Sequence, residues 1–97
     1  MNKRLLISKN VNECNIRLDY YIVEDRYIDI SNNISTYVYG VEIQQVNGKN
    51  PDRIQKRTIH DISCSDKIIE KFIHYLCENE VTPVQLYDVV SEKVDGD

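Results

Sequence analysis

The chain of 97 residues has no tryptophan, no alanine, one phenylalanine and no long apolar run. A helix that crosses a membrane needs ~20 consecutive apolar residues, which no stretch approaches. The basic opening segment holds three apolar residues in a row, Leu5-Leu6-Ile7, whereas a signal peptide needs about 7–15. We therefore expect neither membrane insertion nor export, and a cytoplasmic protein.

Positive charge is scarce as well. Twelve lysine and arginine residues face sixteen aspartates and glutamates, for a net charge of −4. Nucleic-acid-binding domains are usually basic, so nucleic acid is not the expected partner. The three cysteines are an odd number without the spacing of a disulfide framework, which favours a reducing compartment.

The sequence motifs of common enzymes and cofactor sites are missing too. The chain contains no Gly-x-Gly-x-x-Gly, no Walker loop and no paired zinc cysteines, and its carboxylates are scattered. We expect no enzyme, no cofactor and no small-molecule ligand.

The clearest positive signal begins at Thr82. Thr82 is a helix N-cap whose hydroxyl would accept from the amide of Gln85, and Gln85 would reach back to close a capping box. Pro83 occupies the first helical position, where its missing N–H costs nothing. Val81 and Leu86 stand at the two positions of a hydrophobic staple. The pattern predicts a docked C-terminal helix.

The segment before it also has a helical period. Residues 66–78, capped by Ser63 or Ser65, place their apolar side chains on one face of a helix. The apolar residues of this face are Ile68, Ile69, Phe72, Ile73 and Leu76. The C-terminal helix is expected over residues 83–93, with a tail at 95–97.

Earlier segments have the two-residue period of half-buried strands. Apolar side chains alternate over residues 16–30 and 37–43, while residues 53–62 alternate poorly. Residues 1–14 fit either an extra strand or a loose arm. We predict a single α+β domain over residues 1–97, an antiparallel meander of three or four strands followed by two helices packed on one face.

A tight turn at residues 32–33 sets the register of the central hairpin, because asparagine tolerates the left-handed backbone such a turn needs. A two-residue turn there would place Ile28 opposite Tyr37 and Ile22 opposite Ile43. The apolar faces of both strands then coincide.

Four blocks of the sequence, in this order, resemble a known family. They are Tyr20–Glu24, Tyr39–Ile43, Asp61–Ser63 and, most specific of all, Val81–Val90. Over residues 16–94 the chain is similar to a small uncharacterised family of short proteins from spore-forming Gram-positive bacteria, filed as a domain of unknown function. The loop over residues 26–35 is longer or less typical here. The resemblance implies a bacterial, intracellular origin and carries no activity or site residue.

Two clusters of reactive side chains have a structural alternative. His60, Cys64, His74 and Cys77 suit zinc by type, but Cys64 and His74 would lie about 15 Å apart along a helix, too far for shared coordination. Cys64 with His60 and Asp61 has the residue types of a cysteine nucleophile, but no glycine-rich oxyanion loop lies beside it. We expect neither metal nor catalysis.

The basic cluster is formed by Lys49, Arg53, Lys56 and Arg57, interrupted by Asp52. Charge of this kind commonly protects an edge strand from aggregation, which is the interpretation we favour. The alternative is phosphate contact, and with it a nucleic-acid-associated accessory factor.

The predicted register leaves Tyr21, Val23, Tyr27 and Val38 on the sheet face opposite the helices. Two short helices cover one face, and tyrosine is enriched in interface cores, although a half-exposed sheet is ordinary in antiparallel folds. We therefore expect a small non-enzymatic interaction or regulatory module. Its partner would be another protein or a second copy, bound through this face or the C-terminal helix.

Overall fold

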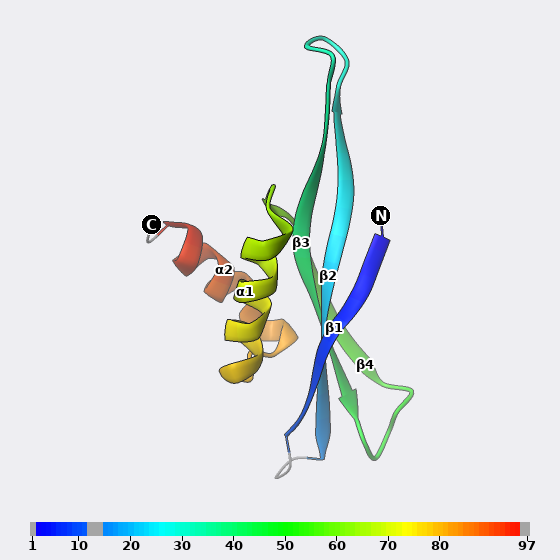
Figure 1. The fold of residues 1–97 in the computed structure, drawn as a ribbon. Helices are drawn as coiled ribbons and strands as arrows, with labels where there is room; N and C mark the ends of the chain where they lie inside the picture. The colour runs from blue at the N-terminus through cyan, green and yellow to red at the C-terminus, as the bar shows by residue number, and fades with distance from the viewer. Residues whose placement is uncertain (1, 12–14, 96–97) are drawn as a thin grey trace.

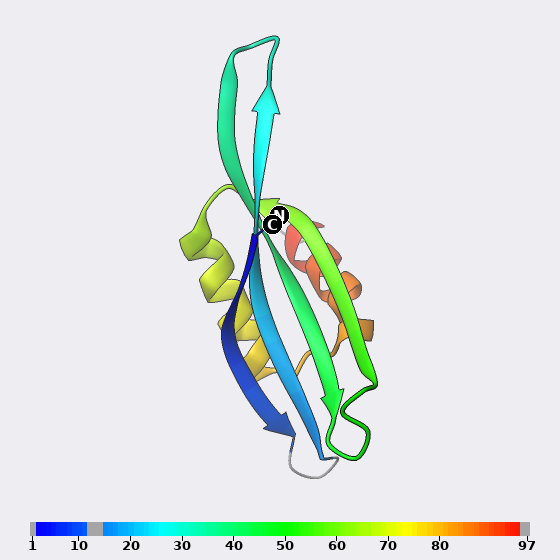
Figure 2. The same ribbon diagram turned by 90° about the vertical axis from the view of Figure 1, so that its right-hand side faces the viewer.

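The computed structural model describes residues 2–11 and 15–95. Their elements are β1 (Asn2–Val11), β2 (Ile16–Asp29), β3 (Ile34–Asn47), β4 (Ile54–Ser63), α1 (Asp66–Glu78) and α2 (Pro83–Asp95). The strands form one antiparallel sheet in the order β1-β2-β3-β4. Figure 1 shows both helices on one face of this sheet, and Figure 2 shows the other face uncovered by any described element. The predicted α+β class is confirmed, with the N-terminal segment as the fourth strand.

The core lies between the inner face of the sheet and the two helices. Alternation along β2 and β3 directs apolar side chains toward the helices, as expected for a sheet covered on one side. The buried residues of this core are Leu18, Tyr20, Ile22, Val41, Ile43, Ile69, Ile73, Leu76, Cys77, Val81, Leu86 and Val90. Burial raises the pKa of the Tyr20 hydroxyl, which donates a 2.9 Å hydrogen bond to the Val81 carbonyl oxygen.

Helix α1 begins and ends where the sequence predicts. Ser65 is its N-cap, with a side-chain oxygen 3.3 Å from the amide nitrogen of Ile68. The predicted apolar face of α1 is wrong at one edge. Ile68, which we expected on that face, is 59% exposed, and Cys77, which we did not place there, is buried. The buried stripe is centred on Ile69, Ile73 and the last turn, so Ile68 lies at its flank.

Helix α2 begins with the predicted return bond, from the Thr82 amide to the Gln85 side-chain oxygen at 3.1 Å. The Gln85 amide donates to the main-chain carbonyl of Thr82 at 3.1 Å, where we expected the hydroxyl as the acceptor. Val81 and Leu86 are both buried, which confirms the staple.

The predicted register of the β2–β3 hairpin is wrong by two residues. Ile28 lies opposite Ser35 rather than Tyr37, and the partner of Ile22 is Val41. Because the displacement is even, every side chain keeps its predicted face.

The reason for the changed register is a loop of four residues, Ile30–Asn33, in place of a two-residue turn. The Asn33 amide donates to the Ile30 carbonyl at 3.3 Å, and Asn33 has a left-handed φ of 54°. The Asp29 carboxylate accepts from the amide and side chain of Asn32, at 3.3 and 2.8 Å. These hydrogen bonds lower the pKa of Asp29.

Strands β3 and β4 pair around an irregularity. The pairing shifts between Tyr39 and Val41, where β4 contains extra residues and Asp61 has a left-handed φ of 56°. A Cβ added to Gly40 would overlap the Ile59 carbonyl oxygen. Only glycine allows the two backbones to approach this closely.

Candidate contact surfaces

The centre of the open sheet face holds a buried carboxylate. Glu42 is 2% exposed and accepts three side-chain hydrogen bonds, from Lys3 at 2.8 Å, Gln44 at 2.7 Å and Thr58 at 2.7 Å. Lys3 reaches across from β1 with its ammonium 5.1 Å from the Tyr21 ring centroid, while Thr58 comes from β4. Glu42 therefore links both edge strands to the centre of the sheet.

These partners determine the charge state of Glu42. Burial alone would raise its pKa, but the hydrogen bonds from Lys3, Thr58 and Gln44 and the positive charge of Lys3 outweigh burial and lower it to about 2. The carboxylate is therefore ionised near neutral pH, and its hydrogen bonds join β1, β3 and β4.

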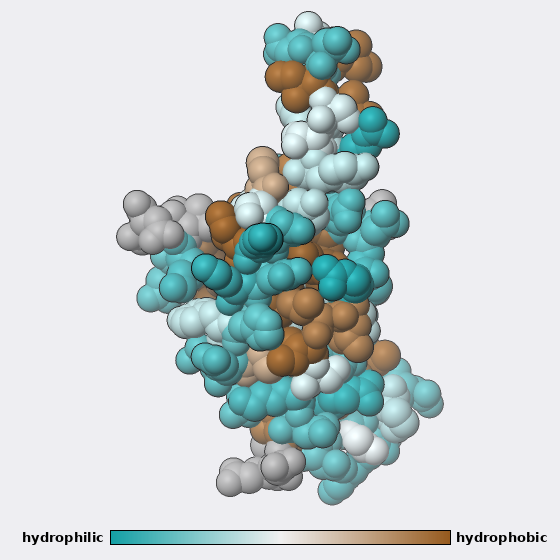
Figure 3. Space-filling view, viewed as in Figure 1, coloured by the Kyte–Doolittle hydropathy of each residue, from teal (hydrophilic) through white to brown (hydrophobic). Residues whose placement is uncertain are grey.

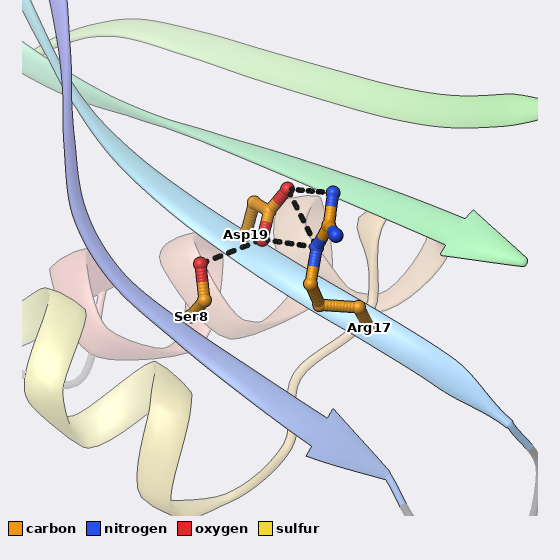
Figure 4. Close-up of polar contacts among 3 residues, drawn as sticks. All are labelled: Ser8, Arg17 and Asp19. Atoms are coloured by element: carbon orange, nitrogen blue, oxygen red, sulfur yellow. Dashed lines mark hydrogen bonds and ion pairs between the residues drawn. The ribbon is translucent and has the colours of Figure 1, made fainter. Parts of the chain in front are cut away.

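A second buried carboxylate, Asp19, lies on the same face (Figure 4). It accepts from the Ser8 hydroxyl at 2.7 Å and from two nitrogens of Arg17, at 3.0 and 3.2 Å. Ser8 belongs to β1, and Arg17 stands two residues before Asp19 on β2, so all three share one face. The central open face thus satisfies its own polar groups.

The residues predicted to form a contact surface differ in what they expose. Val23 and Val38 are buried by their neighbours and Tyr21 is half-buried, whereas Tyr27 is 52% exposed. Val23 has no exposed surface to offer a partner. The free apolar surface of this group lies at Tyr27, beyond the central sheet.

Tyr27 belongs to a projecting hairpin, which we call the arm (residues 25–38). The pairing of β1 with β2 ends at Asn2 and Glu24, and that of β4 with β3 ends at Ser63 and Tyr39. Beyond these pairs β2 and β3 pair only with each other among the described residues, and Figures 1 and 2 show them extending past the rest of the described structure. The molecule is accordingly elongated, with extents of 51 × 30 × 19 Å.

The arm exposes apolar side chains on both of its faces. Five of them have at least half of their surface exposed: Tyr27, Ile28, Ile30, Ile34 and Tyr37. Strand pairing places Tyr27 and Ile34 on one face, Ile28 and Tyr37 on the other, and Ile30 in the terminal loop. Figure 3 shows hydrophobic residues gathered near the end of the projection. Sequence alternation continued to Ile30, but it did not show that the neighbouring strands end earlier.

The basic cluster does not form a single patch. Lys56 and Arg57 are successive residues of β4 and therefore point to opposite faces of the sheet. The Arg57 guanidinium lies 5.9 Å from the ring centroid of Tyr87 on α2. Lys49 and Arg53 are exposed in the loop that leads into β4, which is an edge strand.

The members of the predicted zinc cluster lie in different surroundings. Over residues 2–11 and 15–95, no three His, Cys, Asp or Glu side chains converge as metal ligands would. Cys64 and His74 are exposed, and burial raises the pKa of the Cys77 thiol in the core. Cys14 lies outside the described residues.

His60 has a partner that sequence reasoning missed. Its Nδ1 lies 2.8 Å from a carboxylate oxygen of Asp25, at the base of the arm. The two residues are 35 positions apart, so only the strand order brings them together. The pair ties β4 to the point where the arm leaves the sheet, and Asp61 occupies the bulge next to it.

Comparison with known proteins identifies the chain by family. It belongs to the family of unknown function DUF6514, whose model matches residues 3–96. Neither a curated protein nor a solved structure matches the chain. No helix within the described residues is both long enough and apolar enough to cross a membrane.

Proposed function

We propose that this member of DUF6514 is a non-enzymatic protein-interaction module and that the arm, residues 25–38, is its contact surface. One observation carries the proposal: five apolar side chains are at least half exposed on a hairpin beside which the described residues place no further strand. Large exposed apolar patches on soluble proteins commonly mark interaction sites.

The edges of the arm strengthen this argument. An edge strand presents unpaired N–H and C=O groups, and proteins usually protect such edges with lysine, proline or bulges. The arm contains no lysine and no proline, and its one basic residue, Arg26, donates a 2.9 Å hydrogen bond to Ser35 within the arm. A partner strand added to this edge would satisfy the backbone groups and cover the apolar side chains together.

The central open face supports the proposal by contrast. Interface cores are depleted in charged residues, yet this face holds Asp19 and Glu42 with their partners already in place. Docking a protein there would cover charges without giving them new partners. We therefore assign contact to the arm and a structural role to the central face.

The compartment and the class of partner belong to the proposal. Three cysteines without framework spacing support a reducing, cytoplasmic setting, and the family resemblance supports a bacterial source. The partner is another protein or a second copy of this chain. The nucleic-acid alternative has less support, because the basic residues of β4 point to both faces.

The test replaces two residues on one face of the arm, Tyr27→Lys with Ile34→Lys. The matched control is Val84→Lys with Tyr87→Lys, two exposed positions on α2. Mass in solution by light scattering and quantitative capture from the native cell extract are measured for the wild type and both variants. The arm variant should lose self-association or a specific captured protein while keeping its circular dichroism spectrum, and the control should lose neither.

Two outcomes would refute the proposal. One is that the arm variant and the wild type have the same mass and capture the same proteins. The other is that the α2 control loses the contact as fully as the arm variant. A contact that weakens steeply with added salt would instead support the nucleic-acid alternative, because phosphate contacts release counterions.

A further inference from the structure

A groove of about 460 Å³ lies between the end of β4 and the helices. Ile62 of β4 and Ile68 and Phe72 of α1 form its apolar wall, and Ser63, Ile69, Tyr75 and two lysines complete the lining. Its volume falls within the range of about 300–1,000 Å³ that is typical of small-molecule sites.

The apolar wall of the groove is open to solvent. Ile68 is 59% exposed and lies at the flank of the buried stripe of α1. Phe72 and Tyr75 are stacked, with ring centroids 6.4 Å apart and an angle of 13° between the planes. Ile62 and Phe72 are partly buried and pack against the core, so the wall joins the core on one side and solvent on the other.

The charged side chains among the described lining residues of the groove are both positive. They are Lys71 and Lys93, although the chain has a net charge of −4. The Lys93 ammonium lies 4.6 Å from the Tyr75 ring centroid, and neither lysine forms an ion pair with another described residue. An apolar wall beside two lysines that have no carboxylate partner among the described side chains complements a ligand that has an apolar body and an anionic end.

We propose that this groove binds an anionic amphiphile of the fatty-acid class. The acyl chain lies against Ile62, Ile68 and Phe72, and the carboxylate lies between the ammonium groups of Lys71 and Lys93. Charge-assisted hydrogen bonds from two lysines favour a carboxylate over a neutral head group. The site is separate from the arm and does not depend on the arm's role.

A peptide is a poorer match for the same groove. Its backbone amides would need hydrogen-bonding partners once covered. Besides the lysines, the side chains of the lining offer two hydroxyls, from Ser63 and Tyr75, and the Ser63 oxygen already accepts from the Ser65 amide at 3.0 Å. An acyl chain with a single polar end needs fewer hydrogen-bonding partners than a peptide.

The ligand class is tested with decanoate, below its micelle concentration, against the full chain by calorimetry and NMR. Decanol and decyltrimethylammonium have the same apolar chain with a neutral and a cationic head, respectively. We expect saturable binding of decanoate with shifts at Ile68 and Tyr75. Decanol should bind at least tenfold more weakly, and the cation should show no saturable binding.

The charged contacts are tested with the double variant Lys71→Gln and Lys93→Gln. Its matched control is Lys49→Gln and Lys67→Gln, which removes the same charge from exposed positions outside the groove. The groove variant should bind decanoate at least tenfold more weakly and decanol as before. The control should bind both like the wild type.

Three results would overturn the proposal. The first is no saturable decanoate binding, and the second is equal decanoate affinity in the groove variant and the wild type. The third concerns Ile68→Lys: if this change converts a dimer to a monomer, the groove is a contact between copies and not a ligand site.

Discussion

Replacing Glu42 with glutamine should destabilise the protein more than any other loss of a single negative charge. Glu42→Gln keeps the shape of the side chain but removes the charge that holds Lys3 across the sheet at 2.8 Å. Lys3 would then remain beside a neutral amide. The attachment of both edge strands to β3 would weaken, because Lys3 of β1 and Thr58 of β4 donate hydrogen bonds to the same carboxylate.

The magnitude follows from the pKa of Glu42. Burial acts to raise it, and the hydrogen bonds and the Lys3 charge lower it from 4.5 to about 2. At about 1.36 kcal/mol per pKa unit, this difference corresponds to about 3 kcal/mol of folding free energy at pH 7. For a domain of this size, that is a large part of a total of about 5–15 kcal/mol.

The pH dependence has a definite sign. The pKa of Glu42 is lower in the folded state than in the unfolded chain, so the contribution is complete above pH 4.5 and is lost as the pH falls toward 2. Urea unfolding of the wild type and Glu42→Gln between pH 2 and 7 should show a gap of about 3 kcal/mol at pH 7 that closes in acid. The control is Glu92→Gln, an exposed position of α2, which should change stability by less than about 0.5 kcal/mol. A gap below about 0.5 kcal/mol at pH 7, or one that does not change with pH, would refute the reasoning.

Three further predictions test the fold. Gly40→Ala should cost about 3 kcal/mol in urea unfolding, because the added Cβ overlaps the Ile59 carbonyl; an unchanged midpoint would contradict the close approach of β3 and β4. Gln85→Ala should lower the free energy of unfolding by about 0.5–1 kcal/mol, because the hydrogen bond from the Thr82 amide to the Gln85 side chain is lost. We expect the helix content of the folded variant to stay the same although the protein is less stable. Ile22→Lys should abolish the folded circular dichroism spectrum, while Tyr27→Lys should leave it intact; equal damage by both would mean that their assigned faces are wrong.

The meander and both helices followed from local patterns, and the failures occurred where strands depart from regular pairing. The first strand was ambiguous because its pairing shifts between Leu5 and Ile7, which interrupts the two-residue period. The poor alternation of β4 has the same cause, since extra residues oppose Gly40. A bulge depends on the neighbouring strand, so in the sequence of a single strand it appears only as an interruption of the alternation.

The sites depended on information that local patterns do not hold. Asp19 and Glu42 stand at outward positions, which predicts solvent exposure, and only cross-strand partners such as Lys3 cover them. The groove required the placement of α2 beside α1. The exposure of the arm required knowing where the edge strands end, which no property of residues 25–38 reveals.

Site-specific photo-crosslinking tests the contact role of the arm most directly. Ile30, in the loop that ends the arm, is 89% exposed, and Val84 on α2 is 79% exposed, so the two form a matched pair. Each is replaced in turn by p-benzoylphenylalanine and the protein is irradiated in native cells. A contact role of the arm predicts a discrete crosslinked product, to one protein or to a second copy, from position 30 and not from position 84. No product from position 30, or the same products from both positions, would contradict it.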